Sequence, residues 1–390
     1  MKDWKIGLYA HPDAIVEEPD YAKRLVDAGL DLFIVRTGYG PNYFDSLDDA
    51  VQIVRDLNAQ ICFLSGAFWG GKVIPVENPP DKSNEIKWPM DLPGSTADAG
   101  IVSHVQKLCG QYKPESVCLT HARFRHPALI DDIFDGYRKD TAYLARMEAA
   151  GVLWEDVSAG RADFERALAS ADEKALLNAS EQGLIRFLGE LSQNDIFERF
   201  FSYRCRAVTA SLREFSNAVK AFDGITFGIN AYSPTGAMVC GQDYDDYDNI
   251  CDYLHPLLGY MEWHRFEPLA AWGRYMHRHA RLSEATAVAI AKNLFYLGDT
   301  TCPDSFTALD TCGEGSDRDI LSVVGTELKM CAKYATKPYQ MMPIIKGKTW
   351  SKSVIDTLIR EIDELPFNAF VLQGPDYLLP GIPRSDKWNH

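Results

Sequence analysis

Short apolar runs rich in β-branched and aromatic residues recur along the chain, and segments with helical spacing of apolar positions separate most of them. Continuous apolar strands that alternate with helices are typical of a parallel sheet buried on both faces. Eight such runs are present, which is the number of strands that closes a barrel. The pattern therefore predicts a (β/α)8 barrel with strands at Trp4–Ala10, Asp31–Arg36, Gln60–Leu64, Ser116–Thr120, Gly224–Ile229, Tyr253–Gly259, Tyr339–Ile345 and Phe367–Leu372.

Helices are expected between these strands. Ser46 is a plausible N-cap because acidic residues fill the turn after it, and Ser351 or Ser353 fits the start of a helix that ends near Glu364. After the last strand, a short tail rich in Pro and Gly takes the place of a final helix. The predicted helices are Asp20–Ala28, Ser46–Asn58, Ala97–Tyr112, Leu129–Ala150, Ala162–Ala169, Ala175–Leu191 and Ile196–Phe222.

Three connections are too long for bare loops between a strand and a helix. Residues 66–97 are polar and rich in Pro, whereas residues 121–222 and 260–336 hold helical patterns. We interpret residues 1–390 as a single (β/α)8 catalytic domain with helical insertions at about 121–222 and 260–336. All three connections follow strands at their C-terminal ends, where barrel active sites lie, so they are expected to supply a lid or a substrate wall.

Composition narrows the classes of function. With 40 Lys+Arg against 55 Asp+Glu, the formal net charge is −15, which argues against nucleic acid or an anionic membrane as a partner. The chain contains neither a signal-peptide pattern nor an apolar run long enough to span a membrane. The nine Cys are odd in number and dispersed, as is typical of a reducing compartment. We therefore expect a cytoplasmic protein.

The ends of the predicted strands are rich in aromatic rings and hydrogen-bonding groups. A sugar ring needs both, because its C–H face stacks on an aromatic plane while its hydroxyls take paired hydrogen bonds. The sequence therefore predicts a small-molecule carbohydrate as the ligand of these strand ends. The predicted substrate-binding residues are His11, Arg36, Trp69, His121, Arg123, Tyr232, Tyr260, Trp263 and Lys346.

Cleavage of a glycoside requires two carboxyl groups, one protonated and one ionised. Glu262 and Asp376 form the leading candidate pair, and Asp243 is the third candidate. Trp263 beside Glu262 is expected to raise the pKa of that carboxyl by desolvation. Structural interpretations stay open for each: Glu262 in a salt bridge with Arg265 or Arg274, Asp376 in a Gly-Pro-Asp-Tyr turn, and Asp243 as a helix cap.

Metal and cofactor signatures are weak. His11, His121 and His126 invite a metal interpretation, but a His-x-His after the first strand, a His-Glu-x-x-His run and paired Cys-x-x-Cys motifs are all missing from the sequence. A dinucleotide loop of the Gly-x-Gly-x-x-Gly type is missing as well. We therefore expect neither a catalytic metal nor a cofactor. The arginines Arg36, Arg123 and Arg125 fit a substrate carboxylate or sulfate as well as ion pairs at the barrel rim.

Three segments resemble glycoside-hydrolase-like (β/α)8-barrel proteins. These are Thr120–Ala128 (THARFRHPA), the aromatic and Cys-containing run Phe200–Arg206 (FFSYRCR), and Gly241–Tyr260, which is similar to a loop–helix–strand unit of the form GQDY…VDYxPMLY. The resemblance covers about residues 115–265 and implies a barrel that acts on carbohydrate. Related barrels commonly present an Asp where this chain has Ala122, so one carboxylate implied by the resemblance is missing. Tyr260 and Glu262 match the aromatic and acidic residues that such families place after the sixth strand.

Three functions remain in competition. The leading hypothesis is a glycoside hydrolase acting on a small oligosaccharide or glycoside, with Glu262 as proton donor and Asp376 or Asp243 as its partner. The second is a barrel lyase or isomerase acting on a sugar acid, with His121 or Lys346 as base and the arginines as a carboxylate clamp. The third is a non-catalytic carbohydrate-binding protein. A homo-oligomer is a further possibility, with the 260–336 insertion as the candidate interface.

Overall fold

The computed structural model describes most of the chain, and the following account refers to those residues. They are 5–39, 42–66, 96–124, 127–128, 130–135, 141–334, 336–337, 339–367 and 369–388. The predicted connection 66–97 therefore lies almost entirely outside the described residues, as does Trp69.

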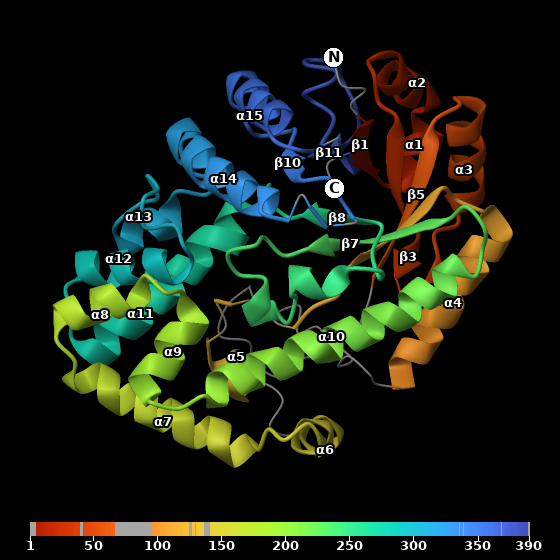
Figure 1. Cartoon of the computed structure of the whole chain (residues 1–390). Helices are drawn as coiled ribbons and strands as arrows, with labels where there is room; N and C mark the ends of the chain where they lie inside the picture. Colours follow the sequence, from red (N-terminus) through yellow and green to blue (C-terminus); the bar gives the residue numbers. More distant parts are fainter. Residues whose placement is uncertain are drawn as a thin grey trace, which may run out of the picture.

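Nine parallel strands form one sheet that closes on itself as a barrel (Figure 1). They are β1 (Lys5–Ala10), β2 (Leu32–Arg36), β5 (Gln60–Gly66), β6 (Ser116–Thr120), β7 (Thr226–Ala231), β8 (Tyr253–Pro256), β9 (Gln340–Met341), β10 (Ile344–Lys346) and β11 (Ala369–Gln373). Their order in the sheet is β10-β11-β1-β2-β5-β6-β7-β8-β9. A separate two-stranded hairpin consists of β3 (Gly38–Tyr39) and β4 (Asn42–Tyr43).

The ring closes through a strand that is interrupted in the middle. β9 pairs with β8, β10 pairs with β11, and Met342 and Pro343 separate β9 from β10. Just beyond β8, Leu257 forms a parallel bridge to Ile344 of β10, which joins the two ends of the sheet. Pro lacks the N–H that a strand interior donates, which explains why the single predicted strand Tyr339–Ile345 splits here. The prediction of an eight-stranded (β/α)8 barrel is thus confirmed, with its seventh strand in two pieces.

The helices have the following bounds. Around the barrel lie α1 (Pro12–Glu17), α2 (Pro19–Asp27), α3 (Leu47–Asp56), α4 (Thr96–Tyr112) and α15 (Lys352–Glu364). After β6 come α5 (Ile130–Asp135), α6 (Thr141–Ala149), α7 (Trp154–Ser170), α8 (Glu173–Ser180), α9 (Leu184–Ser192) and α10 (Ile196–Lys220). After β8 come a π-helical turn (Glu262–Phe266), α11 (Glu267–Ala280), α12 (Glu284–Leu294), α13 (Phe306–Thr311) and α14 (Asp317–Ala332).

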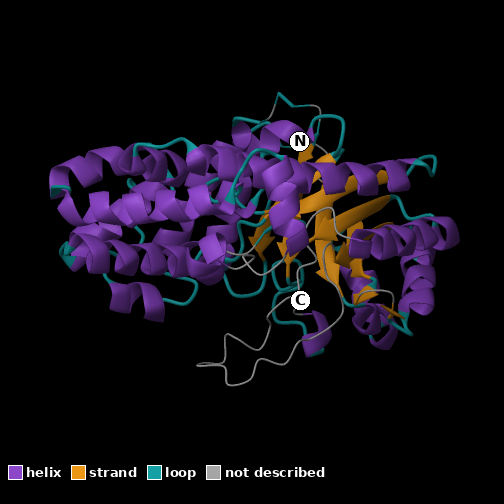
Figure 2. Ribbon diagram, turned by 90° about the horizontal axis from the view of Figure 1, so that it is seen from below, coloured by secondary structure: helices purple, strands orange, loops and turns teal. Residues whose placement is uncertain are grey.

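The two insertions follow the fourth and sixth barrel strands, as predicted, and pack against each other. Helix α8 contacts α12, and α7 contacts α11, so helices from both insertions form one layer. Figure 2 shows this layer as a helical region beside the strands. Predicted helices of the first insertion are shorter in the structure, since Leu129–Ala150 contains α5 and α6, and Ala175–Leu191 contains α8 and α9. The assignment of the whole chain to a single domain stays a prediction.

Buried apolar side chains form two cores. The larger core lies between the strands and the surrounding helices. The smaller one fills the barrel interior with alternate residues of the strands, such as Leu32 and Ile34 of β2, because successive side chains of a strand point to opposite faces. Gly228 of β7 belongs to this interior, where a Cβ at its position would come within 2.2 Å of the Tyr253 ring. Gly228 is therefore required by the size of Tyr253.

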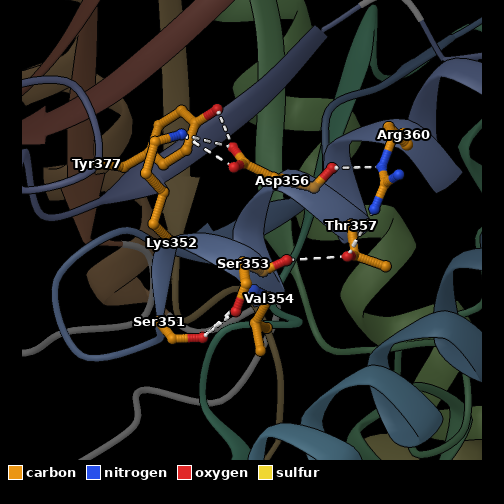
Figure 3. Close-up of polar contacts among 8 residues, drawn as sticks. All are labelled: Ser351, Lys352, Ser353, Val354, Asp356, Thr357, Arg360 and Tyr377. Atoms are coloured by element: carbon orange, nitrogen blue, oxygen red, sulfur yellow. Dashed lines mark hydrogen bonds and ion pairs between the residues drawn. The ribbon is translucent and has the colours of Figure 1, made fainter.

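Helix α15 begins at Ser351, one of the two serines predicted to start it. Ser351 is its N-cap, and the Ser351 hydroxyl accepts a hydrogen bond from the Val354 N–H. Figure 3 shows that Lys352 and Tyr377 both reach Asp356 on this helix. The Lys352 Nζ also lies 5.0 Å from the centre of the Tyr377 ring. These contacts fix the loop that follows β11 against α15. At Ser46 the outcome differs, because its hydroxyl donates to Asp13 and makes no side-chain cap on α3.

Candidate functional site

Three strands end in polar side chains that continue the inward-facing series of the barrel interior. On β2, the buried interior residues Leu32 and Ile34 are followed two positions later by Arg36. The same alternation follows Ile344 on β10 and Val371 on β11. We define the mouth as the end of the barrel at which the strands have their C-termini. The side chains placed at the mouth by this alternation are those of Arg36, Lys346 and Gln373.

Tyr260 is the point on which the mouth residues converge. The Gln373 Nε2 donates a hydrogen bond to the Tyr260 hydroxyl at 2.7 Å. Burial raises the pKa of Tyr260 to about 12, the positive charge of Arg36 acts against this rise, and the negative charge of Glu314 adds to it. The tyrosine therefore lies near a guanidinium, a carboxylate and an amide that come from three different parts of the chain.

Glu314 is a mouth residue that sequence reasoning missed. It lies in the turn between α13 and α14, inside the second insertion, and forms an ion pair with Lys346 of β10. Its second oxygen, Oε2, is buried and has no hydrogen-bond partner among the described residues, and the same is true of the Gln373 Oε1. Buried acceptors are usually satisfied, so a bound group with hydrogen-bond donors would suit these two atoms.

His121 follows β6 in a backbone conformation that non-glycine residues rarely adopt. Its φ is 60°, in the left-handed region, and its Nδ1 lies 3.1 Å from the Thr120 hydroxyl. Burial, followed by the charges of Arg123 and Arg36, lowers the pKa of His121 to about 3. The imidazole is therefore neutral at physiological pH. Strained residues of this kind cluster at functional sites.

Arg123 and Tyr232 form a packed pair beside His121. The Arg123 guanidinium lies 5.5 Å from the centre of the Tyr232 ring, within the range of a cation–π contact. Tyr232 is buried, and its hydroxyl donates to the backbone carbonyl of His264 at 3.1 Å. The pair thus joins the connection after β6 to the π-helical turn after β8.

Glu262 and Trp263 lie on that π-helical turn, and both side chains are exposed. Trp263 is 64% exposed, so the expected desolvation of Glu262 by this ring is not found. The salt-bridge interpretation of Glu262 is also wrong, because Arg265 pairs with Glu327 and Arg274 pairs with Asp310. Glu262 lies near the turn that contains Glu314, since its charge contributes, after burial, Asp319 and Cys302, to raising the pKa of the Cys312 thiol to about 11.

The other two carboxylate candidates have structural contacts. Both oxygens of Asp376 accept hydrogen bonds from the Arg384 guanidinium, at 2.8 to 3.0 Å. Asp243 caps the 3-10 turn Tyr244–Tyr247 by accepting a hydrogen bond from the Asp245 N–H at 3.0 Å, and burial raises the pKa of Asp243. The capping interpretation of Asp243 is confirmed. A catalytic role for either residue stays a prediction.

His11 is placed at the first strand end but acts locally as a helix cap. Its Nδ1 accepts a hydrogen bond from the Asp13 N–H at 3.3 Å, and its ring centre lies 4.3 Å from that of Phe44. Burial lowers the pKa of His11, and Arg36 contributes to this lowering. The charge of Arg36 therefore acts on two of the other predicted binding residues, His11 and His121.

A layer of polar side chains lies in the barrel interior beneath the mouth, and the sequence analysis did not identify it. The Tyr9 hydroxyl donates to Asn230 Oδ1 at 2.7 Å, which links β1 to β7 across the barrel. Cys118 of β6 lies 3.2 Å from the same Asn230 oxygen and 3.7 Å from Nδ1 of His255. The alternation of inward positions along each strand was the signal that could have found this layer.

The Gly241–Tyr244 segment of the family resemblance has a structural role. Gln242 is fully buried, its Nε2 donates to the Ala122 carbonyl at 2.9 Å, and its Oε1 accepts from the Tyr232 N–H at 2.6 Å. This side chain therefore holds together the loops that follow β6 and β7. The resemblance thus marks a segment that shapes the mouth, although Ala122 supplies no carboxylate there.

Clusters of three or more His, Cys, Asp or Glu side chains suited to a metal ion do not occur among the described residues. Within the same part of the chain, no helix is long and apolar enough to cross a membrane. All nine cysteines are free thiols, so Cys302 and Cys312 form no disulfide.

Comparison with known proteins gives similarities to solved structures alone. Neither a family model nor a curated protein matches the chain. Among solved structures, a chitinase from Rhizomucor miehei is similar over 94% of this chain and 93% of its own, with a TM-score of 0.40 and 11% sequence identity. The barrel fold itself rests on the strand pairing described above.

Proposed function

We propose that the protein is a glycoside hydrolase whose active site lies at the mouth of the barrel, with Glu314 and Glu262 as its two carboxyl groups. One observation supports this proposal most: Gln373, Arg36 and Glu314 all lie near Tyr260. Gln373 and Glu314 each have a buried acceptor atom without a partner among the described residues. Hydroxyl groups of a sugar are donors that match these acceptors.

The two carboxyl groups suit different roles. Glu314 is paired with the Lys346 ammonium and is the candidate for the ionised partner, which acts as base or nucleophile. Glu262 is exposed on the neighbouring π-helical turn and is the candidate for the proton donor. Trp263 beside it offers an exposed aromatic face on which a sugar ring can stack. Short π-helical segments of this type are frequent at functional sites.

A lyase or isomerase mechanism has less support. Its proposed bases are His121 and Lys346, and a catalytic base should have a pKa near the working pH. Burial, Arg123 and Arg36 lower the pKa of His121 to about 3, and Lys346 is engaged by Glu314. Neither side chain is therefore well suited to remove a proton from a substrate.

The test is hydrolysis of chromogenic α- and β-glycosides by the purified protein, with and without a chelator. If the protein turns over a glycoside, Glu314→Gln and Glu262→Gln should each lower kcat by roughly a hundredfold or more, while the circular dichroism spectrum stays that of the folded protein. Asp163→Asn serves as the matched control, because its carboxylate lies in an exposed ion pair with Arg166 on α7, and it should lose less than about tenfold. Full activity of Glu314→Gln would overturn the assignment of the catalytic pair, and hydrolysis of no glycoside by the wild type would overturn the function.

A further inference from the structure

Arg36 is a positively charged side chain at the mouth, and it lies outside the ion pairs that the described residues form there. Its guanidinium forms no ion pair and no hydrogen bond with the part of the chain that the structure describes. Its charge contributes to lowering the pKa values of His11 and His121 and opposes the rise in the pKa of Tyr260. Two other cations near the mouth have ion-pair partners: Lys346 pairs with Glu314, and Arg384 pairs with Asp376.

His121 and Tyr260, two neighbours of Arg36, supply no negative charge. His121 is neutral because its pKa is about 3, and Tyr260 keeps its proton because its pKa is about 12. Arg123 adds a second positive charge that has no ion-pair partner among the described residues, and its guanidinium is occupied by the Tyr232 ring and the Phe124 carbonyl. Arg36 and Arg123 thus place two positive charges without an ion-pair partner among the described residues close to His121, in a chain with a formal net charge of −15.

Two hydrogen-bond acceptors near Tyr260 have no partner among the described residues. Gln373, which is 6% exposed, has an Oε1 without a hydrogen-bond partner, and the buried Oε2 of Glu314 has none either among the described residues. Because Lys346 and Gln373 are register partners on β10 and β11, and Lys346 pairs with Glu314, these acceptors are neighbours. Around Tyr260 the mouth therefore combines a guanidinium that can bind an anion with two acceptor atoms that can bind hydrogen-bond donors.

We propose that the ligand of the mouth is an anionic sugar, whose charged group binds Arg36 while its hydroxyls donate to Gln373 and Glu314. The inference names the substrate class of the proposed hydrolase and rests on the location of that site. A guanidinium donates two parallel hydrogen bonds to a carboxylate or a phosphate, and such charge-assisted pairs are stronger than neutral ones. The anionic group is therefore the carboxylate of a uronic acid or the phosphoryl group of a sugar phosphate.

Binding is tested by calorimetry on the full chain with three probes: glucuronate, glucose 6-phosphate and glucose. We expect at least one of the two anionic probes to bind roughly tenfold or more tighter than glucose, and this preference to shrink as NaCl is raised. The stronger of the two anionic probes identifies the carboxylate or the phosphoryl group as the natural partner. Equal affinity for glucose and for both anionic probes would overturn the proposal.

Two variants locate the charged group. Arg36→Gln should abolish the preference for the anionic probe, whereas Arg36→Lys should keep part of it, because an ammonium retains the charge but cannot form the two parallel hydrogen bonds. The matched control is Arg166→Gln, which removes an arginine from an exposed pair with Asp163 on α7 and should leave the preference unchanged. If Arg36→Gln does not fold, the Arg36→Lys titration alone decides: a preference equal to that of the wild type contradicts the proposal.

A separate experiment distinguishes failure of this inference from failure of the proposed function. The p-nitrophenyl β-glucuronide and β-glucoside are compared as substrates, together with p-nitrophenyl β-glucoside 6-phosphate. Faster turnover of the neutral glucoside than of both anionic substrates would overturn the anionic-sugar inference and leave the hydrolase standing. Turnover of none, with Arg36-dependent binding of glucuronate or glucose 6-phosphate, would overturn the hydrolase and support the inference.

Discussion

Arg265 and Glu327 form a fully buried ion pair that joins the π-helical turn after β8 to helix α14. The Arg265 Nε lies 2.6 Å from the Glu327 Oε1, and the two side chains are 2% and 0% exposed. The same Glu327 oxygen accepts a hydrogen bond from the Thr235 hydroxyl at 2.6 Å. The pair therefore fixes three connections behind the mouth, including the turn on which Glu262 and Trp263 lie.

Breaking this pair on one side should destabilise the protein strongly. Glu327→Ala leaves the Arg265 charge buried and uncompensated, which costs about 3–5 kcal/mol of unfolding free energy. The double variant Arg265→Met, Glu327→Leu removes both charges and should be more stable than Glu327→Ala. Urea unfolding followed by circular dichroism measures the stability of the wild type and of both variants. A double variant less stable than Glu327→Ala would show that the uncompensated Arg265 charge is not the source of the loss.

His255 makes the stability of the barrel dependent on pH. It is fully buried in the barrel interior, and burial lowers its pKa from 6.5 to about 3. Below pH 6.5 the unfolded chain binds a proton at this position and the folded chain does not, so the free energy of unfolding falls as the pH drops toward 3. The expected slope is about 1.4 kcal/mol per pH unit for this one group, fully developed below pH 6.

The measurement compares urea unfolding of the wild type and His255→Asn between pH 7.5 and 5. The variant should show a shallower loss of stability toward low pH, whatever its stability at pH 7.5. Between pH 7.5 and 9 the two proteins should have the same slope, because the histidine is neutral in both the folded and unfolded states. Equal slopes below pH 6.5 would contradict the assignment of a neutral buried imidazole.

Trp388 anchors the C-terminal segment to the first helices of the barrel. It is fully buried, its Nε1 donates to Glu18 Oε2 at 2.7 Å, and its ring centre lies 5.2 Å from that of Tyr21. Trp388→Ala should lower the free energy of unfolding by about 3–5 kcal/mol, as for other large buried aromatic residues. Lys387→Ala, which removes an exposed ion pair with Glu17, should leave the thermal midpoint nearly unchanged. Similar midpoints for both variants would show that the segment does not contribute to stability.

Gly228 and Gly100 should respond oppositely to the same substitution. A Cβ at Gly228 meets the Tyr253 ring inside the barrel, whereas a Cβ at Gly100, on helix α4, meets nothing within 4 Å. Gly228→Ala is therefore expected to destabilise by about 1–3 kcal/mol because it overpacks the interior. Gly100→Ala should stabilise by about 0.5–1 kcal/mol because alanine favours the helix. Thermal unfolding measures both, and a stable Gly228→Ala would mean that the Tyr253 ring has room to move.

The barrel was predictable because its signals are local. Each strand is a short apolar run, and all eight occur where the pattern predicts them, although proline at position 343 divides the seventh. Alternation along the strands also contains the information that Arg36, Lys346 and Gln373 share one face with the interior residues. The strand ends alone predict Lys346 and Arg36 as binding residues. Placing Gln373 at the mouth also requires the alternation of inward and outward positions along its strand.

The carboxylates were harder to predict because their roles depend on partners distant in sequence. Glu314 lies in a turn between two insertion helices, so a search of strand ends cannot find it. Its position follows only from the packing of the insertion over β10. Arg265 was considered a partner of Glu262, but its true partner is Glu327 on α14. Charge pairing across a fold is not encoded in local spacing, so ion-pair partners distant in sequence require the structure.

The pairing of β1 with β11 has a consequence for how the chain acquires its fold. The register joins Lys5 to Ala369 and Leu8 to Leu372. One edge of β1 therefore has no hydrogen-bond partner until β11, the last strand of the barrel, has been synthesised. During synthesis β1 and the growing end of the sheet are open parallel edges, which are slow to pair and prone to join other chains. Closure of the ring is therefore a late event that follows release of β11 from the ribosome, and a chain cut before residue 369 is expected to aggregate rather than form a smaller barrel.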